Sequence, residues 1–193
     1  MLIVRTPPGR ESMRRYACAV VLGDWFGLPW RHEVDARTDV AISLEGRLGE
    51  LRLPDLLLGI PESDWLAPAS LPRLPLAQWD ARSLGADCTL VTPLVPILYG
   101  TAAREVERSS DILSLPLDLL GSIFFMITGY DELVCTERDA HGRFPAAASV
   151  AQHAGFLERP LADEYTELLW HAMHSLWPQL ERRPKAPKLI LSC

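Results

Sequence analysis

Val40-Ala41-Ile42-Ser43-Leu44-Glu45-Gly46-Arg47, followed by Glu50-Leu51-Arg52-Leu53, is the stretch that decides the fold class. Large apolar residues alternate in the first segment with smaller or polar ones, which is the period of a strand with one buried face. Glu45-Gly46-Arg47 predicts a turn, and the alternation resumes after it in the second segment. We therefore predict a meander of strands here, with a further strand over Leu28–Val34 before it.

Three helices are predicted around this meander. Residues Glu11 to Phe26 place apolar side chains on one face, with Ser12 as the expected N-cap and Gly27 as the stop. A helix that begins near Pro116 and runs to Ile127 is apolar on nearly all sides, which predicts a central position. The last helix runs from near Pro160 to Pro178, with acidic residues in its first turn, where the helix dipole favours negative charge.

Residues 54 to 115 carry a weaker pattern. Leu74-Pro75-Leu76 and Val95–Tyr99 are expected as short edge strands, because proline is tolerated mainly at sheet edges. Arg104–Ser110 is polar and is expected to be a loop or a solvated turn of helix. Together these patterns predict a single α/β (α+β) domain, in which a small mixed, partly antiparallel sheet is packed by about three main helices.

Composition narrows the class of protein. The net charge of −6 argues against nucleic-acid binding, which needs a basic face. Four cysteines occur without a Cys-x-x-Cys pair, so neither structural zinc nor a disulfide framework is indicated. Met1–Pro8 lacks the regions of a secretory signal, and the apolar run Leu119–Ile127 is shorter than the roughly 18–20 residues of a membrane span. We expect a cytoplasmic protein with reduced thiols and no transmembrane segment.

A polar cluster follows the central apolar helix. Together with one arginine further along the chain, it comprises Tyr130, Asp131, Glu132, Asp139, His141, Arg143 and Arg159. Acidic, histidine and arginine side chains together suit general acid–base chemistry or anion recognition. The same residues also suit a structural lock, in which ion pairs and backbone hydrogen bonds hold a long loop against two helices.

Asp131 and Glu132 are expected near the C-terminal end of the central helix. The helix dipole disfavours anions there by about 0.3–1 kcal/mol. We therefore expect the two carboxylates to pair with cations, for which Arg143 and Arg159 are the nearest candidates and Arg138 is a further one.

Two histidines in the last predicted helix have a spacing that can hold a metal. His171 and His174 lie at i,i+3, but the pattern supplies no acidic third ligand. No metal site is predicted there.

Three segments in close order carry a family resemblance: Tyr130–Glu132, Asp139–Phe144 and Gly155–Leu161. Together they resemble the uncharacterised domain found N-terminal to the catalytic domain of bacterial NodB-like polysaccharide deacetylases. The chain departs from that family at one point. Where the family has Ser-Arg-Tyr-Glu-Glu, this chain has Thr128-Gly129-Tyr130-Asp131-Glu132, which puts any role of the arginine in doubt.

The resemblance implies a division of the chain. Residues 1–180 would be the accessory domain, 181–188 a proline-rich linker, and 189–193 the first strand of a deacetylase domain that continues beyond Cys193. The divalent metal and its ligands would belong to that following domain, and no cofactor is expected in this chain. The implied function is a non-catalytic module that docks to the deacetylase domain in cis, or helps to hold a glycan, in cell-surface polysaccharide metabolism.

Two alternatives remain open from the sequence. One is a small stand-alone enzyme or ligand-binding domain, with Asp139, His141 and Arg143 at its site and Asp131 or Glu132 as the base. The other is an interaction module that forms a homodimer through the amphipathic last helix.

Overall fold

The computed structural model describes residues 1–85, 90–102 and 105–184. The strands of its main sheet are β1 (Leu2–Thr6), β2 (Trp30–Val34), β3 (Asp39–Leu44), β4 (Glu50–Pro54), β7 (Glu107–Arg108) and β8 (Ile112–Ser114). They lie in the order β2-β1-β3-β4-β8-β7. β1 and β2 run parallel, as do β4 and β8, and the other neighbours are antiparallel. The sheet is therefore mixed.

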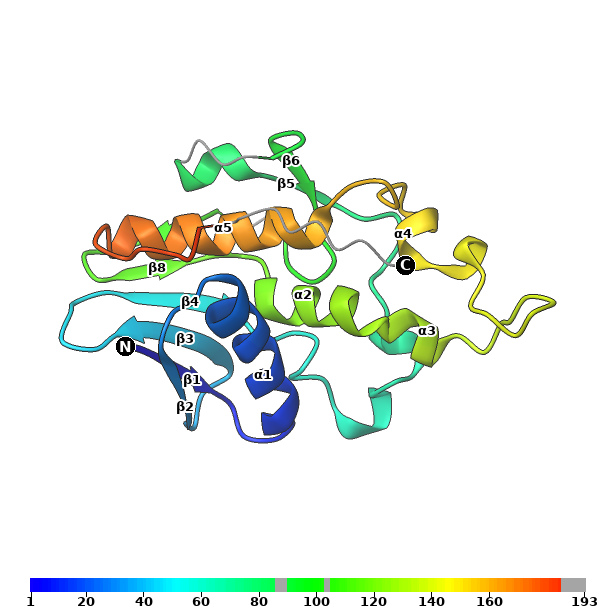
Figure 1. Ribbon diagram of the computed structural model, residues 1–193, viewed down its shortest axis with the longest axis horizontal. Helices are drawn as coiled ribbons and strands as arrows, with labels where there is room; N and C mark the ends of the chain where they lie inside the picture. Colours follow the sequence, from blue (N-terminus) through cyan, green and yellow to red (C-terminus); the bar gives the residue numbers. More distant parts are fainter. Residues whose placement is uncertain (86–89, 103–104, 185–193) are drawn as a thin grey trace, which may run out of the picture.

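The helices of the described residues are α1 (Glu11–Cys18), α2 (Leu119–Thr128), α3 (Tyr130–Val134), α4 (Val150–His153) and α5 (Leu161–Leu176). Figure 1 shows α1, α2 and α5 over the main sheet, with α2 between the other two. The predicted α+β class, with a mixed sheet and three main helices, is confirmed.

The main sheet has one apolar face and one charged face. Val4 pairs with Ile42, and Ile42 pairs with Leu51, so these three residues lie on the same face and join the helices in one buried core. Residues one position away point to the other face, as strand geometry requires. That face carries the ion pairs Arg5–Glu33, Arg52–Glu50 and Arg37–Asp39. The alternation seen in the sequence separates these two faces.

β1 is the longest of the strands that sequence analysis missed. It lies between β2 and β3, so it is an interior strand of the sheet. Leu2, Ile3 and Val4 are all buried, and such a continuous apolar run shows no alternation by which a short strand could be recognised.

The predicted helix boundaries are partly correct. α1 continues as a wider π-helix, η1 (Ala19–Trp25), so the helical segment ends close to the expected Gly27. The expected cap at Ser12 is wrong, because Arg10 occupies the N-cap position in a left-handed conformation with φ of 44°. Its guanidinium donates hydrogen bonds to the carbonyl oxygens of Leu58 and Ile60, which holds the chain in this entry geometry.

Short elements occupy the region where the sequence pattern was weak. The 3-10 turns there are η2 (Glu62–Asp64), η3 (Pro68–Ser70) and η4 (Ala81–Leu84), and a further one, η5 (Ala146–Ala148), lies between α3 and α4. β5 (Gln78–Asp80) and β6 (Leu94–Pro96) pair as a small antiparallel sheet. The expected strand at Val95–Tyr99 is thus partly correct.

Two expectations in this region are wrong. Leu74-Pro75-Leu76 forms no strand. The polar segment expected to be a loop contains β7, which pairs with β8 at the edge of the sheet. A two-residue edge strand is stabilised by its partner and leaves no pattern of its own. Residues 185–193, which hold the second half of the expected linker and all of the expected last strand, lie outside the described residues.

Candidate functional site

Tyr130 is a buried structural residue rather than part of an open site. Its side chain is 1% exposed. The hydroxyl accepts a hydrogen bond from the Leu66 backbone N–H at 2.8 Å and donates to Ser70 Oγ at 3.0 Å. Trp65 packs edge-on against the ring at 5.0 Å between ring centroids. Tyr130 therefore holds the segment around residues 65–70 against the end of α2.

The prediction that Asp131 and Glu132 lie at the C-terminal end of the central helix is wrong. α2 ends at Thr128, and Gly129 has φ of 60°, a left-handed conformation that glycine adopts without steric cost. A new helix, α3, begins directly afterwards, so both carboxylates lie in its first turn. The helix break therefore removes them from the unfavourable end of α2.

The prediction that these carboxylates pair with Arg143 and Arg159 is also wrong. Asp131 Oδ2 accepts a hydrogen bond from the Val150 backbone N–H at 3.0 Å, and Oδ1 accepts one from the N–H of Glu132 at 3.1 Å. Asp131 thereby ties α3 to the start of α4. Arg143 and Arg159 pair instead with other acids.

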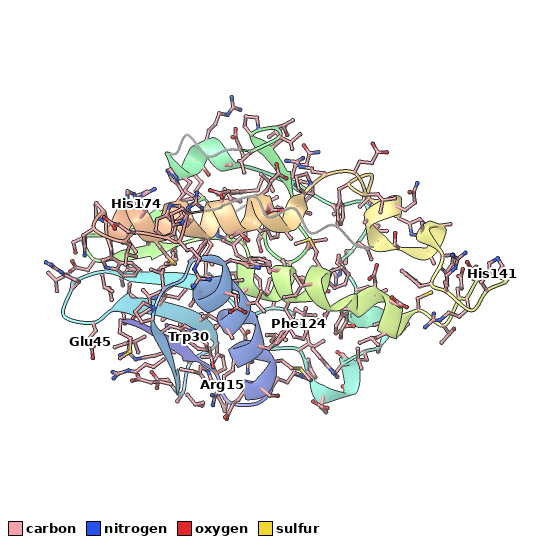
Figure 2. The ribbon with its side chains drawn as sticks, viewed as in Figure 1. Arg15, Trp30, Glu45, Phe124, His141 and His174 are labelled. Carbon is pink, nitrogen blue, oxygen red and sulfur yellow. The ribbon has the colours of Figure 1, made fainter. Side chains whose placement is uncertain are left out.

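Asp139 and Arg143 form a self-contained turn. Asp139 Oδ1 accepts hydrogen bonds from the backbone N–H groups of His141 and Arg143, at 2.8 and 2.9 Å. Its Oδ2 lies 2.9 Å from Arg143 Nη2. These bonds, above all that from the Arg143 N–H, lower the pKa of Asp139. Figure 2 shows His141 on the protruding loop at the far end of the molecule from His174, and its side chain is exposed.

Arg159 forms a tie between the start of α5 and the small sheet. Its Nε lies 2.6 Å from Oε2 of Glu164, whose residue is only 2% exposed. Arg159 Nη2 also donates to the Leu94 carbonyl oxygen at 3.0 Å, and Glu164 Oε1 accepts from the Val91 N–H at 2.7 Å. Glu164 was not among the predicted site residues. The sequence feature that could have identified Glu164 is its position three residues after Leu161, on the buried face of the helix.

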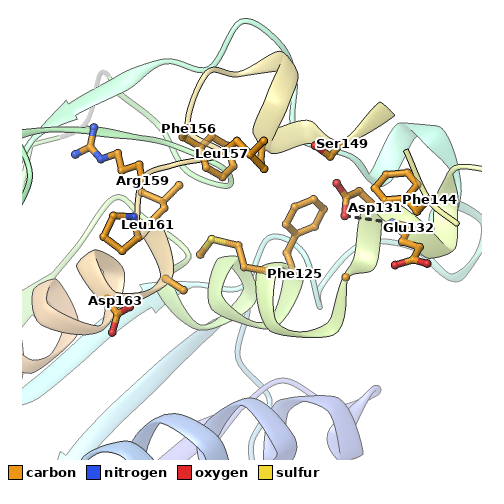
Figure 3. Close-up of a pocket in the computed structure, with 15 residues that line it drawn as sticks. Phe125, Asp131, Glu132, Phe144, Ser149, Phe156, Leu157, Arg159, Leu161 and Asp163 are labelled. Atoms are coloured by element: carbon orange, nitrogen blue, oxygen red, sulfur yellow. Dashed lines mark hydrogen bonds between the residues drawn. The ribbon is translucent and has the colours of Figure 1, made fainter. Parts of the chain in front are cut away.

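A cleft of about 360 Å³ lies between α2, α3, α4 and the start of α5. Of the predicted cluster, Asp131, Glu132 and Arg159 line it, whereas Tyr130, Asp139, His141 and Arg143 do not. Its apolar wall includes Phe125, Phe144, Phe156 and Leu157. Figure 3 shows Phe125 and Asp131 on one side and Arg159 on the other, with the guanidinium directed away from them. The cleft can hold an apolar group beside carboxylates, but it brings no histidine to them.

A second set of buried charged groups was missed by sequence analysis. Arg14 Nη2 lies 2.6 Å from Asp55 Oδ2, and both side chains are 3% exposed. Arg14 also donates to the carbonyl oxygens of Pro7, Gly9 and Leu58, so the buried guanidinium is well satisfied. Such a pair needs these additional bonds, because removing both charges from water is costly.

Asp118 caps α2 and binds the segment that follows β4. It is 1% exposed. Its Oδ1 accepts from the Gly121 N–H at 2.8 Å, and its Oδ2 accepts from the N–H groups of Leu56 and Leu57 at 2.8 and 3.0 Å. Burial raises the pKa of Asp118 to about 7, with a further contribution from the charge of Asp55, although the three N–H donors act against the rise. An aspartate directly before an apolar helix was the available signal for this cap.

No metal centre emerges from the described residues. Within the ranges 1–85, 90–102 and 105–184, no group of three His, Cys, Asp or Glu side chains is placed to hold an ion. The divalent metal implied by the resemblance therefore has no such ligand set in this part of the chain. His174 packs against Trp170 with ring centroids 5.6 Å apart.

In the same described ranges, no helix has the length and apolarity needed to cross a bilayer.

The chain belongs to a family of unknown function, DUF7033, whose model matches residues 2–178. The match therefore runs from β1 to just beyond α5. Comparison with curated proteins found no match, and comparison with solved structures found none either. The expectation of a domain of unknown function is confirmed at this level.

Proposed function

We propose that this chain is a non-catalytic accessory domain of a polysaccharide-deacetylase-like protein. It would dock to the catalytic domain, or help to hold a glycan, in cell-surface polysaccharide metabolism. One observation supports the non-catalytic role: three of the residues in the segments that carry the resemblance, Tyr130, Asp131 and Arg159, use their polar groups to tie segments of the domain together. Fold and family alone do not assign chemistry, so the proposal rests on how these groups are used.

The ties join parts of the chain that are far apart. Tyr130 binds the segment at residues 66–70, Asp131 binds the start of α4, and Arg159 with Glu164 binds the strand β6 and the residues before it. Tyr130 and Glu164 are buried, and the Tyr130 hydroxyl both accepts and donates a hydrogen bond, so these two groups are closed to a substrate. The contacts of Tyr130, Asp131 and Arg159 therefore shape the surface around the cleft.

The cleft is the surface that this scaffold offers to a partner. Leu157 lines the cleft and is 52% exposed. Exposed apolar groups beside a concave surface are typical of docking or ligand sites. Glu132 is also exposed and lines the same cleft, so both residues can be changed without disturbing the core.

A ligand-binding role for the same cleft is the second candidate, favoured by its volume and by the carboxylates of Asp131 and Glu132 in its lining. A catalytic role would require His141 to reach these acids, and His141 does not line the cleft. A dimer through the apolar face of α5 would need residues that already pack in the core, such as Leu168, Leu169 and Ala172.

The first test is to read the coding sequence beyond Cys193. Absence of a segment with the aspartate and two histidines of a metal-dependent deacetylase would overturn the proposal.

If that segment is present, the full-length protein allows a functional test. Leu157→Asp should lower deacetylation of an N-acetylated oligosaccharide severalfold without lowering the melting temperature. Leu48→Asp is the matched control, because Leu48 is 83% exposed and does not line the cleft. Equal activities of the two variants would contradict docking or glycan holding at the cleft. Activity that survives removal of the metal ligands would point to chemistry in the present domain.

A further inference from the structure

A second concave surface lies where the parallel strands β4 and β8 end. A hollow of about 460 Å³ is lined by the last residues of β4, by Ser114 at the end of β8, and by Thr101. We call it the polar hollow. Crevices outside the carboxyl ends of parallel strands are favoured ligand sites in open sheets. None of the residues that carry the family resemblance lines this surface.

A neighbouring hollow of about 490 Å³ adjoins it. This proline hollow is lined by Pro72 and Pro75, by several aliphatic side chains and by Tyr99. Leu56, which is 41% exposed, lines both hollows, and the consecutive residues Gly100 and Thr101 line one each. The two hollows therefore adjoin, with Leu56 between them, and we call them together the trough. Each part alone has the volume of a typical small-molecule site, so the whole suits an extended ligand.

The junction of the trough is built rigidly. A Cβ atom on Gly100 would lie 2.7 Å from the carbonyl oxygen of Pro116, so the two segments approach as closely as their backbones allow. The N–H groups of Leu56 and Leu57 are bound by Asp118. A preformed site loses less conformational entropy when it binds a ligand.

The polar hollow offers both hydrogen-bond donors and acceptors. Hydroxyl groups come from Thr38, Thr101 and Ser114. Asp39 and Arg52 also line it, and each is held by an ion pair, Arg37 Nε to Asp39 Oδ1 at 2.6 Å and Arg52 Nε to Glu50 Oε1 at 2.6 Å. Oriented donors and acceptors of this kind match the hydroxyl groups of a sugar ring. The exposed Pro75 and the half-buried Tyr99 of the neighbouring hollow offer apolar surface to its C–H faces.

The charge of the trough favours an uncharged ligand. Its charged lining residues are Asp39, Arg52 and Glu107 in the polar hollow and Arg73 in the proline hollow. Two carboxylates and two guanidinium groups balance, so the trough lacks the excess of positive charge that a phosphate backbone requires.

A peptide strand is disfavoured in the same place. Pro54, Pro72, Pro75 and Pro116 line the trough and have no N–H to donate. The N–H of Leu56 at the junction is already used. Strand addition depends on free main-chain donors and acceptors along the site.

We propose that this trough binds an uncharged oligosaccharide, with sugar hydroxyls in the polar hollow and ring faces in the proline hollow. The chemistry follows from the lining residues, while the biological context rests on the proposed function.

Binding to residues 1–193 tests the proposal, with chitotetraose, cellotetraose and maltotetraose as probes in titration calorimetry or NMR. At least one tetrasaccharide should bind with a Kd at or below about 1 mM. Thr101→Trp and Ala77→Trp each fill one hollow from an exposed position and should weaken binding by roughly tenfold or more. Ala140→Trp, on the exposed loop beside His141, is the matched control and should leave Kd unchanged. Melting temperatures identify any variant that fails to fold.

Three results would overturn the proposal. The first is that none of the tetrasaccharides binds. The second is binding that survives both trough variants. If such binding is instead lost in Leu157→Asp, the glycan lies in the cleft, and the proposed function stands without the trough. The third is that a neutral hexapeptide binds the native chain and the sugars do not. If the trough variants then lose this peptide binding, the trough is a peptide site.

Discussion

Asp118→Asn removes a buried ionisable group and keeps nearly the same side-chain shape. In the folded protein, burial raises the pKa of Asp118 from its ordinary value of 3.8 to about 7. The folded state therefore holds this proton more tightly than the unfolded chain does. The stabilising effect is fully present below pH 3.8 and is lost as the pH rises towards 7. Above pH 7 both states are ionised and no further change is expected from this residue.

The size of the effect follows from the shift. A change of about three pKa units corresponds to about 4 kcal/mol in the free energy of unfolding. The groups that face Asp118 are Asp55, which raises its pKa, and the phenols of Tyr99 and Tyr165, whose own pKa values are raised mainly by burial. Arg14 is engaged by Asp55.

Asparagine cannot reproduce all the bonds of the carboxyl group. It has one acceptor oxygen, so its amide N–H₂ must face backbone donors at Gly121 or at Leu56 and Leu57. We expect a cost of about 1–3 kcal/mol at pH 4, where the native carboxyl group is protonated. Because the variant does not titrate, this cost should fall as the pH rises, and the variant becomes the more stable protein where the fall exceeds the cost.

Urea unfolding followed by circular dichroism from pH 4 to 8 measures both effects. The unfolding free energy of the native chain minus that of Asp118→Asn should fall by up to about 4 kcal/mol between pH 4 and 7 and then level off. Asp139→Asn is the control. The lowered pKa of Asp139 gives stability that is lost only as the pH falls below about 4, so its difference should stay flat above that pH. A flat difference for Asp118→Asn would refute the argument that burial outweighs the three N–H bonds.

Two further predictions concern the ion pair of Arg159 with Glu164 and the hydrogen bonds of the Tyr130 hydroxyl. Arg159→Ala leaves the buried carboxylate of Glu164 without its cation and should lower the free energy of unfolding by about 3–5 kcal/mol. Arg143→Ala breaks an exposed pair and should leave the urea midpoint nearly unchanged; equal losses in the two variants would contradict the assignment of the buried tie. Tyr130→Phe removes the acceptor of the partly buried Leu66 N–H and the donor to the buried Ser70 Oγ, and should cost about 1–3 kcal/mol, whereas Tyr16→Phe, 48% exposed, should be neutral. A neutral Tyr130→Phe would show that these bonds add nothing to stability.

Elements with a regular period were predictable from the sequence. The alternation in β3 and β4 and the helical spacing in α5 identified both the elements and their buried faces. β1 was not predictable in the same way, because its first three residues are apolar and all buried in the middle of a sheet, which leaves no alternation. β7 depends on its pairing with β8 and has no pattern of its own.

The candidate site was less predictable than the fold. Residues that lie close together in the sequence were expected to form one cluster. Instead, a left-handed Gly129 ends α2 and starts a new helix, and the loop with Asp139 and Arg143 closes on itself. Asp131, Glu132 and Arg159 meet around the cleft, but the acids and the arginine do not pair with one another.

The sequence alone determined the α+β class and the main helices. Tertiary structure decided which polar groups are buried and what they bind. Asp118 binds a backbone N–H 62 residues away, Tyr130 binds a hydroxyl 60 residues away, and Glu164 binds an N–H 73 residues away. The physical reason is the separation along the sequence between residues that interact. Periodicity reports neighbours two to four residues apart, whereas burial and hydrogen-bond partners are set by segments that meet only when the chain has folded.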